Sequence, residues 1–309
     1  MHLRSSAAKF RSHGQKPPEV HSQSIDGNPS AIYNIDSSVL HRSPYSGGAI
    51  HESARRLLDG GEGINDADDI IGPPLNWAAM CGQIEMARFL LSKGAKVNAM
   101  IGGREATPLW TAAESGHPDM VRFLVSKGAD IELGTAERQV PLSAAVNRLD
   151  IVTFLLSKGA KVNGDPRFRG ETPLSSAALI GNKAVVDLLI AKGADVNLTG
   201  KGGDAPIANA ARGGCIEIAK TLLEHGAKVN PTVGAPSVEM AVKGEHKDMV
   251  IFLISKGANV NAVTYGNTAL DMAIDKHHAE IVTILRQHGA LTSHELRMRH
   301  GRKGRHPNG

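Results

Sequence analysis

The stretch TGKGGD, Thr199 to Asp204, is the part of the sequence that most resembles a loop for holding a phosphate group. A nucleotide-binding loop of this kind needs a first glycine five residues before its Gly-Lys pair, and a Ser or Thr after the lysine. Here Asp195 occupies the first position and Gly202 follows Lys201. We therefore interpret this stretch as a glycine-containing turn, without a phosphate-binding role.

Metal and acid-base chemistry are also poorly supported by the spacing of candidate residues. The chain has 14 histidines and two cysteines, Cys81 and Cys215, but no Cys-x-x-Cys, His-Glu-x-x-His or Gly-x-Ser-x-Gly motif. His277 and His278 are adjacent, so on a helix their side chains point apart and do not chelate together. We expect no catalytic residues, no metal and no cofactor, and therefore no enzyme.

Five acidic residues recur at regular intervals along the chain, which suggests that their role is structural and not catalytic. These residues precede apolar stretches of helical spacing, where a negative charge favours the helix N-terminus; they are Asp119, Asp150, Glu217, Asp248 and Glu280. Their recurrence indicates that the helices that carry them also recur along the chain.

The chain is built on a repeat of about 33 residues. The heptapeptide SKGAKVN occurs at Ser92 to Asn98 and again at Ser157 to Asn163. One glycine of this segment or its variants recurs at separations of 33, 34, 31, 34, 33, 31 and 32 residues, at Gly61, Gly94, Gly128, Gly159, Gly193, Gly226, Gly257 and Gly289. A fixed period of this length is typical of a stacked repeat architecture.

The sequence pattern of each unit predicts a turn, a short helix, a corner and a longer helix. A triplet such as the TPL at Thr107 opens the first helix, since threonine caps free amides and proline suits the first helical position. The stretch from Asp119 to Asp130 has apolar residues at helical spacing. The recurring glycine then ends the second helix, where a left-handed residue is needed.

The combined pattern resembles the ankyrin repeat. It covers residues 46–293 and includes seven full repeats, which start near Asp66, Ala99, Leu133, Gly164, Leu198, Pro231 and Ala262, after a degenerate capping unit. The resemblance implies an all-α solenoid of helix-turn-helix units with β-turn-like fingers. We expect disordered segments on both sides, at residues 1–45 and, with a basic character, at residues 294–309.

Two units depart from the regular length. Repeat three is two residues short between Pro141 and Gly159, and the turn before repeat six is short as well. The histidine that the family usually has after the TPL triplet is absent from every unit. These irregularities either shape a binding groove or reflect simple drift, and both interpretations stay open.

The charge distribution separates the ends of the chain from the repeats. Residues 1–18 and 291–309 each carry a net charge of +4 and the whole chain +4, which leaves −4 for residues 19–290. Nucleic acid is therefore expected to bind at most weakly, through the tails. No apolar run approaches the length of a membrane span, and no secretory signal is visible. We expect a cytoplasmic or nuclear location.

The resemblance implies a protein-binding surface formed by turn tips and by the exposed side of the first helices. On this chain the surface includes Met80, Met100, Arg138, Arg167, Phe168, Arg169, Leu179, Ile180, Arg212 and Tyr265. Aromatic and arginine side chains contribute much of the energy of interfaces, so Phe168 between two arginines is the densest candidate. We expect a monomeric, non-catalytic scaffold or regulatory adaptor for one or more proteins. The alternative is a nuclear transcription co-regulator that uses the basic tail as an import signal.

Overall fold

The computed structural model describes residues 64–65, 73–100, 106–135, 139–165, 171–200 and 203–303. The predicted N-terminal segment 1–45, most of the degenerate unit and the final residues 304–309 lie outside this part of the chain. Four predicted partner-binding residues also lie outside it, namely Arg138, Arg167, Phe168 and Arg169.

Within the described residues, seven pairs of antiparallel helices follow one another, which agrees with the seven predicted repeats. The first helices of the pairs are α3 (Pro74–Met80), α5 (Pro108–Glu114), α7 (Pro141–Ala144), α9 (Pro173–Ile180), α11 (Pro206–Arg212), α13 (Ser237–Lys243) and α15 (Ala269–Asp275). The second helices are α4 (Ile84–Ser92), α6 (Pro118–Ser126), α8 (Leu149–Ser157), α10 (Lys183–Ala191), α12 (Ile216–Glu224), α14 (Lys247–Ser255) and α16 (Ala279–Gln287).

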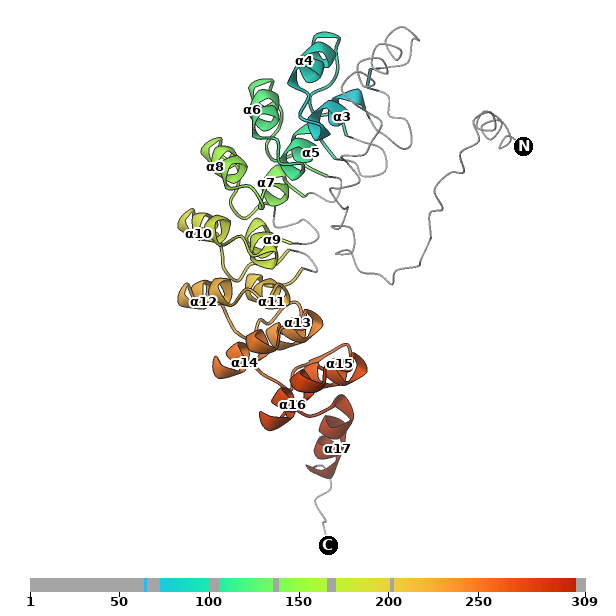
Figure 1. Ribbon diagram of the computed structural model, residues 1–309, viewed down its shortest axis with the longest axis vertical. Helices are drawn as coiled ribbons and strands as arrows, with labels where there is room; N and C mark the ends of the chain where they lie inside the picture. Colours follow the sequence, from blue (N-terminus) through green and yellow to red (C-terminus); the bar gives the residue numbers. More distant parts are fainter. Residues whose placement is uncertain are drawn as a thin grey trace, which may run out of the picture. The chain divides into compact units, whose positions relative to one another are not determined.

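The repeats form a curved double row. The first helices line the inner side of the curve and the second helices line the outer side (Figure 1). The turn before α15 forms a small antiparallel hairpin of β1 (Val263–Thr264) and β2 (Asn267–Thr268). Along the described part of the chain, no helix is both long and apolar enough to cross a membrane.

One apolar core runs between the two rows. Its first-helix side is rich in alanine, and the paired alanines such as Ala112 and Ala113 are fully buried. Its second-helix side has one leucine per repeat at equivalent places, such as Leu124 and Leu155, also fully buried. Small residues on one row and large ones on the other let neighbouring helices approach closely, so each repeat is stabilised mainly by the next.

The predicted helix starts and stops are confirmed where the sequence has the right residues. The hydroxyl of Thr107 accepts a hydrogen bond from the N–H of Trp110, and Thr172 does the same for Ser175. Thr268 and Asp271 form a reciprocal capping box at α15. The seven described glycines that recur once per unit, Gly94, Gly128, Gly159, Gly193, Gly226, Gly257 and Gly289, have a positive φ between 77° and 93°.

A ladder of hydrogen bonds joins each unit to the next and explains the last residue of SKGAKVN. The side-chain oxygen of that residue accepts from a backbone N–H in the following unit, at 2.7 to 3.0 Å. The seven accepting residues are Asn65, Asn98, Glu132, Asn163, Asn197, Asn230 and Asn261. Since Asn65 takes part, the degenerate unit ends with the same connection as the full repeats.

Repeat three is shortened at its first helix; the two missing residues predicted a tighter first helix or a tighter corner. Helix α7 has four residues, whereas the other first helices have seven or eight. Arg148 stands where His117 and His246 stand in other units, and its guanidinium donates to the carbonyl of Gly116 at 2.8 Å. The bond replaces the one that His117 makes to the carbonyl of Met80 at 2.9 Å.

The C-terminal segment differs from the predicted disordered tail. Residues Ser293–Lys303 form helix α17, so the prediction is corrected for 294–303. The cause is a capping box: the hydroxyl of Thr292 accepts from the N–H of Glu295, while the Glu295 carboxylate accepts from the N–H of Thr292. Arg286 of α16 adds an ion pair to Glu295 at 2.7 Å.

Candidate partner-binding surface

The described residues of the predicted surface fall into two groups. Met80, Leu179, Ile180 and Arg212 lie at the C-terminal ends of first helices, on the inner row. Ile180 is 58% exposed, and the other three are half-buried. Met100 and Tyr265 lie in turns between repeats and are both exposed. These side chains therefore lie on several different repeats, at helix ends and in turns.

The hairpin before α15 presents the most exposed aromatic side chain of the described residues. Tyr265 is fully exposed and has a φ of +50°, a left-handed conformation that bulky residues adopt only at a cost. Asparagine or glycine would suit this turn better. Val263 on β1 is 55% exposed, and Val233 in the preceding turn is 56% exposed. Folding gives no reason for a tyrosine at this position.

Three acidic residues that the sequence motifs did not single out lie at the bases of the turns in repeats four to six. They are Glu171 and Asp204, each just before the cap residue of a first helix, and Glu239 in the first turn of α13, and we call this group the polar junction. Asp204 accepts a hydrogen bond from the N–H of Ala235 at 2.8 Å. Glu171 and Asp204 occupy the same place in consecutive units, and aligning the units would have revealed them as neighbours.

Glu171 has the most perturbed pKa of this group. Burial and then the nearby charge of Asp204 raise the pKa of Glu171 from 4.5 to about 7. The side-chain N–H of Asn209 donates to the Glu171 carboxylate, and Arg212 is close enough to oppose the shift. Asn209 itself is fully buried, and its Oδ1 has no partner among the described residues.

Glu239 belongs to the same polar junction. Burial is the largest cause that raises the pKa of Glu239, and Asp204 adds to it, whereas a hydrogen bond to Thr264 lowers it. Thr264 lies on β1, so this carboxyl group joins repeat six to the hairpin of repeat seven. The junction therefore couples the turn tips to the inner helices beneath them.

The arrangement offers little for covalent or metal chemistry. Burial raises the pKa of the Cys81 and Cys215 thiols, which disfavours the reactive thiolate. Within the described ranges, no group of three or more His, Cys, Asp or Glu side chains could hold a metal ion. The inner side instead presents exposed or half-buried side chains, such as Ile180 and Arg212.

Comparison with known families agrees with this geometry. Residues 101–165, 142–233 and 237–295 match a model of three tandem ankyrin repeats, and residues 73–100 match the model of a single ankyrin repeat. The chain belongs to the ankyrin repeat family. The predicted family and fold are thereby confirmed.

Relatives of this ankyrin repeat chain are larger proteins of diverse kinds. It is 32% identical over 253 residues to the ankyrin repeat and KH domain-containing protein mask-1 of Caenorhabditis elegans, covering 69% of this chain and 10% of that protein. It is 24% identical to human transient receptor potential cation channel subfamily A member 1, covering 74% of this chain and 25% of the channel subunit. The chain therefore spans at most a quarter of the length of these two relatives.

A solved structure supports the fold. The ankyrin repeat domain of human ASB11 superposes with a TM-score of 0.57 at 23% identity, covering 71% of this chain and 98% of that domain. At this identity the likeness extends to the architecture alone.

Proposed function

We propose that this chain is a non-catalytic protein-interaction scaffold or adaptor, which binds a protein partner through the inner row and the turn tips as a monomer. The family supports this proposal, because ankyrin repeats generally mediate protein-protein interactions. A stack whose side chains are displayed from rigid helices loses little conformational freedom when it binds.

The observation that carries the proposal is Tyr265. A fully exposed tyrosine held in a left-handed turn is unfavourable for folding, and it supplies the kind of rigid aromatic anchor that dominates many interfaces. Val263 in the same hairpin and Val233 in the preceding turn are also exposed. Arg138, Arg167, Phe168 and Arg169 stay predictions for the same surface.

The test is a Tyr265→Asn variant in affinity capture. Asparagine tolerates the left-handed turn, so the thermal unfolding temperature is expected to stay the same or to rise. Recovery of the main captured protein is expected to fall at least about tenfold, roughly 1.4 kcal/mol. Ile251→Thr, which changes a 45% exposed residue of the outer helix α14, is the matched control and should retain capture. Full capture by a folded Tyr265→Asn variant would exclude this surface.

The second candidate function is that of a nuclear transcription co-regulator. The proposed location of the protein is accordingly cytoplasmic or nuclear. The support for a nuclear role is the basic surface of α17, where Arg297 and Arg299 are exposed. Replacing these two residues and the following Arg302, Lys303 and Arg305 by glutamine leaves the Thr292 cap intact. Nuclear accumulation of the tagged parent that the glutamine variant loses would support the import signal, and identical distributions would contradict it.

A further inference from the structure

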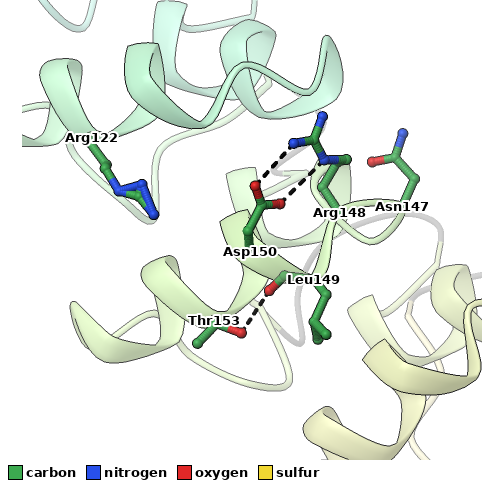
Figure 2. Close-up of a pocket in the computed structure, with 6 residues that line it drawn as sticks. All are labelled: Arg122, Asn147, Arg148, Leu149, Asp150 and Thr153. Carbon is green, nitrogen blue, oxygen red and sulfur yellow. Dashed lines mark hydrogen bonds and ion pairs between the residues drawn. The ribbon is translucent and has the colours of Figure 1, made fainter.

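A shallow, open groove lies beside the shortened repeat three, on the outer side of the stack. Its volume is about 600 Å³, and it is lined by Arg122, Asn147, Arg148, Leu149, Asp150 and Thr153. Figure 2 shows Arg122 reaching from α6 on one side, with Arg148 and Asp150 on the other. Because α6 and α8 are both second helices, the groove lies on the row opposite to the surface described above.

The two arginines of the groove differ in whether they have an ion-pair partner. Arg148 donates to both oxygens of Asp150, at 3.2 and 3.0 Å, so its charge is already paired. Arg122 lies over the ring of Phe154, with 5.3 Å from its guanidinium carbon to the ring centroid. Within the described ranges, Arg122 forms no ion pair. The groove therefore retains one positive charge without an ion-pair partner, on a side chain stacked against a phenylalanine ring.

Arg88 occupies the equivalent position in the first repeat, and it differs from Arg122 in having an ion-pair partner. Arg88 lies over Phe123 at 5.2 Å, in nearly the same geometry, but it is also paired with Glu85 at 3.4 Å. Stacking on phenylalanine holds a guanidinium flat and leaves the N–H donors at its edge available. Arg122 keeps these donors free, whereas Arg88 uses part of its own.

The remaining lining residues define what can lie beside the free guanidinium. Leu149 is 43% exposed at the start of α8 and offers an apolar contact. Asn147 is exposed in the shortened corner, and its amide has no hydrogen bond among the described residues. The Thr153 hydroxyl donates to the carbonyl of Leu149 at 2.7 Å and is not free to donate elsewhere.

We propose that this groove is a second interaction site, which binds an acidic side chain of a partner protein with an aliphatic residue next to it. The carboxylate would accept two parallel hydrogen bonds from Arg122, the geometry in which arginine recognises carboxylates. Asn147 donates a further hydrogen bond to the segment, and Leu149 packs against the aliphatic neighbour. The paired Asp150 repels a second negative charge, so the site favours a single acid over a run of acids.

The experiment uses the full chain and two blocked peptides that differ in charge alone, acetyl-Leu-Glu-Leu-amide and acetyl-Leu-Gln-Leu-amide. The readout is the NMR signal of the Arg122 Nε–H and of the Asn147 side-chain amide during titration. We expect both signals to shift and saturate with the glutamate peptide, and the glutamine peptide to bind at least about tenfold more weakly. Equal binding of the two peptides would overturn the proposal.

Substitutions then separate the site from general charge effects. Arg122→Gln should reduce binding of the glutamate peptide at least about tenfold, and Arg88→Gln, the same change one repeat away, should leave it unchanged. Arg122→Lys should recover only part of the affinity, because lysine lacks the planar pair of donors. Equal losses in the two glutamine variants, or tighter binding of a short oligouridylate than of the peptide, would refute a site for acidic protein segments.

Discussion

The side-chain oxygen of Asn197 accepts a hydrogen bond of 2.9 Å from the backbone N–H of Lys228, 31 residues further along the chain. Its side-chain N–H also donates to the carbonyl of Gly226 at 3.0 Å. Asn197→Ala removes both bonds, and we expect a loss of about 1–2 kcal/mol in the free energy of unfolding. Urea denaturation of the variant and of the parent measures this difference in the free energy of unfolding.

The control for this prediction is Thr199→Ala. Thr199 lies two residues later and makes no hydrogen bond to the next unit within the described ranges. Its denaturation midpoint should match that of the parent. If Asn197→Ala also matched the parent, the ladder would be a consequence of stacking and would not contribute to stability.

The corner of repeat five is constrained by the histidine of repeat six. Gly214 has a φ of +69°, and a Cβ at this position would lie 2.6 Å from Nδ1 of His246. Gly193 has a φ of +87°, but a Cβ there would meet nothing within 4 Å. Alanine at either place costs about 1–2 kcal/mol for the left-handed conformation. Gly214→Ala should cost about 1–3 kcal/mol more, because the ring must move.

Thermal unfolding of the two alanine variants checks this difference. Adding His246→Ala to Gly214→Ala should remove the excess cost, so that the double variant shows a strong coupling between the sites. Equal destabilisation by Gly193→Ala and Gly214→Ala would show that the histidine yields without cost.

The raised pKa of Glu171 predicts a pH dependence of stability. Between pH 4.5, its ordinary value, and about 7, the folded chain holds a proton that the unfolded chain has lost. Stability therefore falls as the pH rises through this window, and the penalty is complete above it. Glu171→Gln cannot ionise but can still accept from Asn209.

We expect Glu171→Gln to unfold at a higher temperature than the parent at pH 8 and at the same temperature at pH 4.5. Glu217→Gln changes a carboxylate whose side chain is 75% exposed, and serves as the control. A parallel pH dependence of the parent and Glu171→Gln would mean that Glu171 titrates normally.

The pKa of Glu295 is lowered, opposite to that of Glu171, which predicts that helix α17 loses stability in acid. The ion pair with Arg286, and then the N–H of Thr292, lower the pKa of Glu295 from 4.5 to about 2. Its contribution is present above pH 4.5 and disappears as the pH falls towards 2. Glu295→Gln should therefore speed amide hydrogen exchange in α17 at pH 6 while α14 keeps its protection. Unchanged exchange in α17 would assign its stability to other contacts.

Local chemistry explains which features could be predicted. Thr107 and Thr172 cap their helices through residues three positions away, so one unit contains all the information. The two missing residues of repeat three predicted a tighter first helix or corner, and the structure has the four-residue α7. The polar junction could not be predicted from one unit, because Glu171 depends on Asp204 and Asn209 of the next unit. Nor does sequence spacing reveal that Arg122 lacks an acidic partner while Arg88 has one.

The ladder also bears on how such a chain can evolve. Each unit offers a side-chain acceptor to the unit after it and a backbone donor to the unit before it, at nearly constant places. A tandem duplication of one unit would bring both groups with it, and the new copy would join its neighbours without further mutations. Selection can therefore lengthen the binding surface first, and alter the side chains that it displays afterwards.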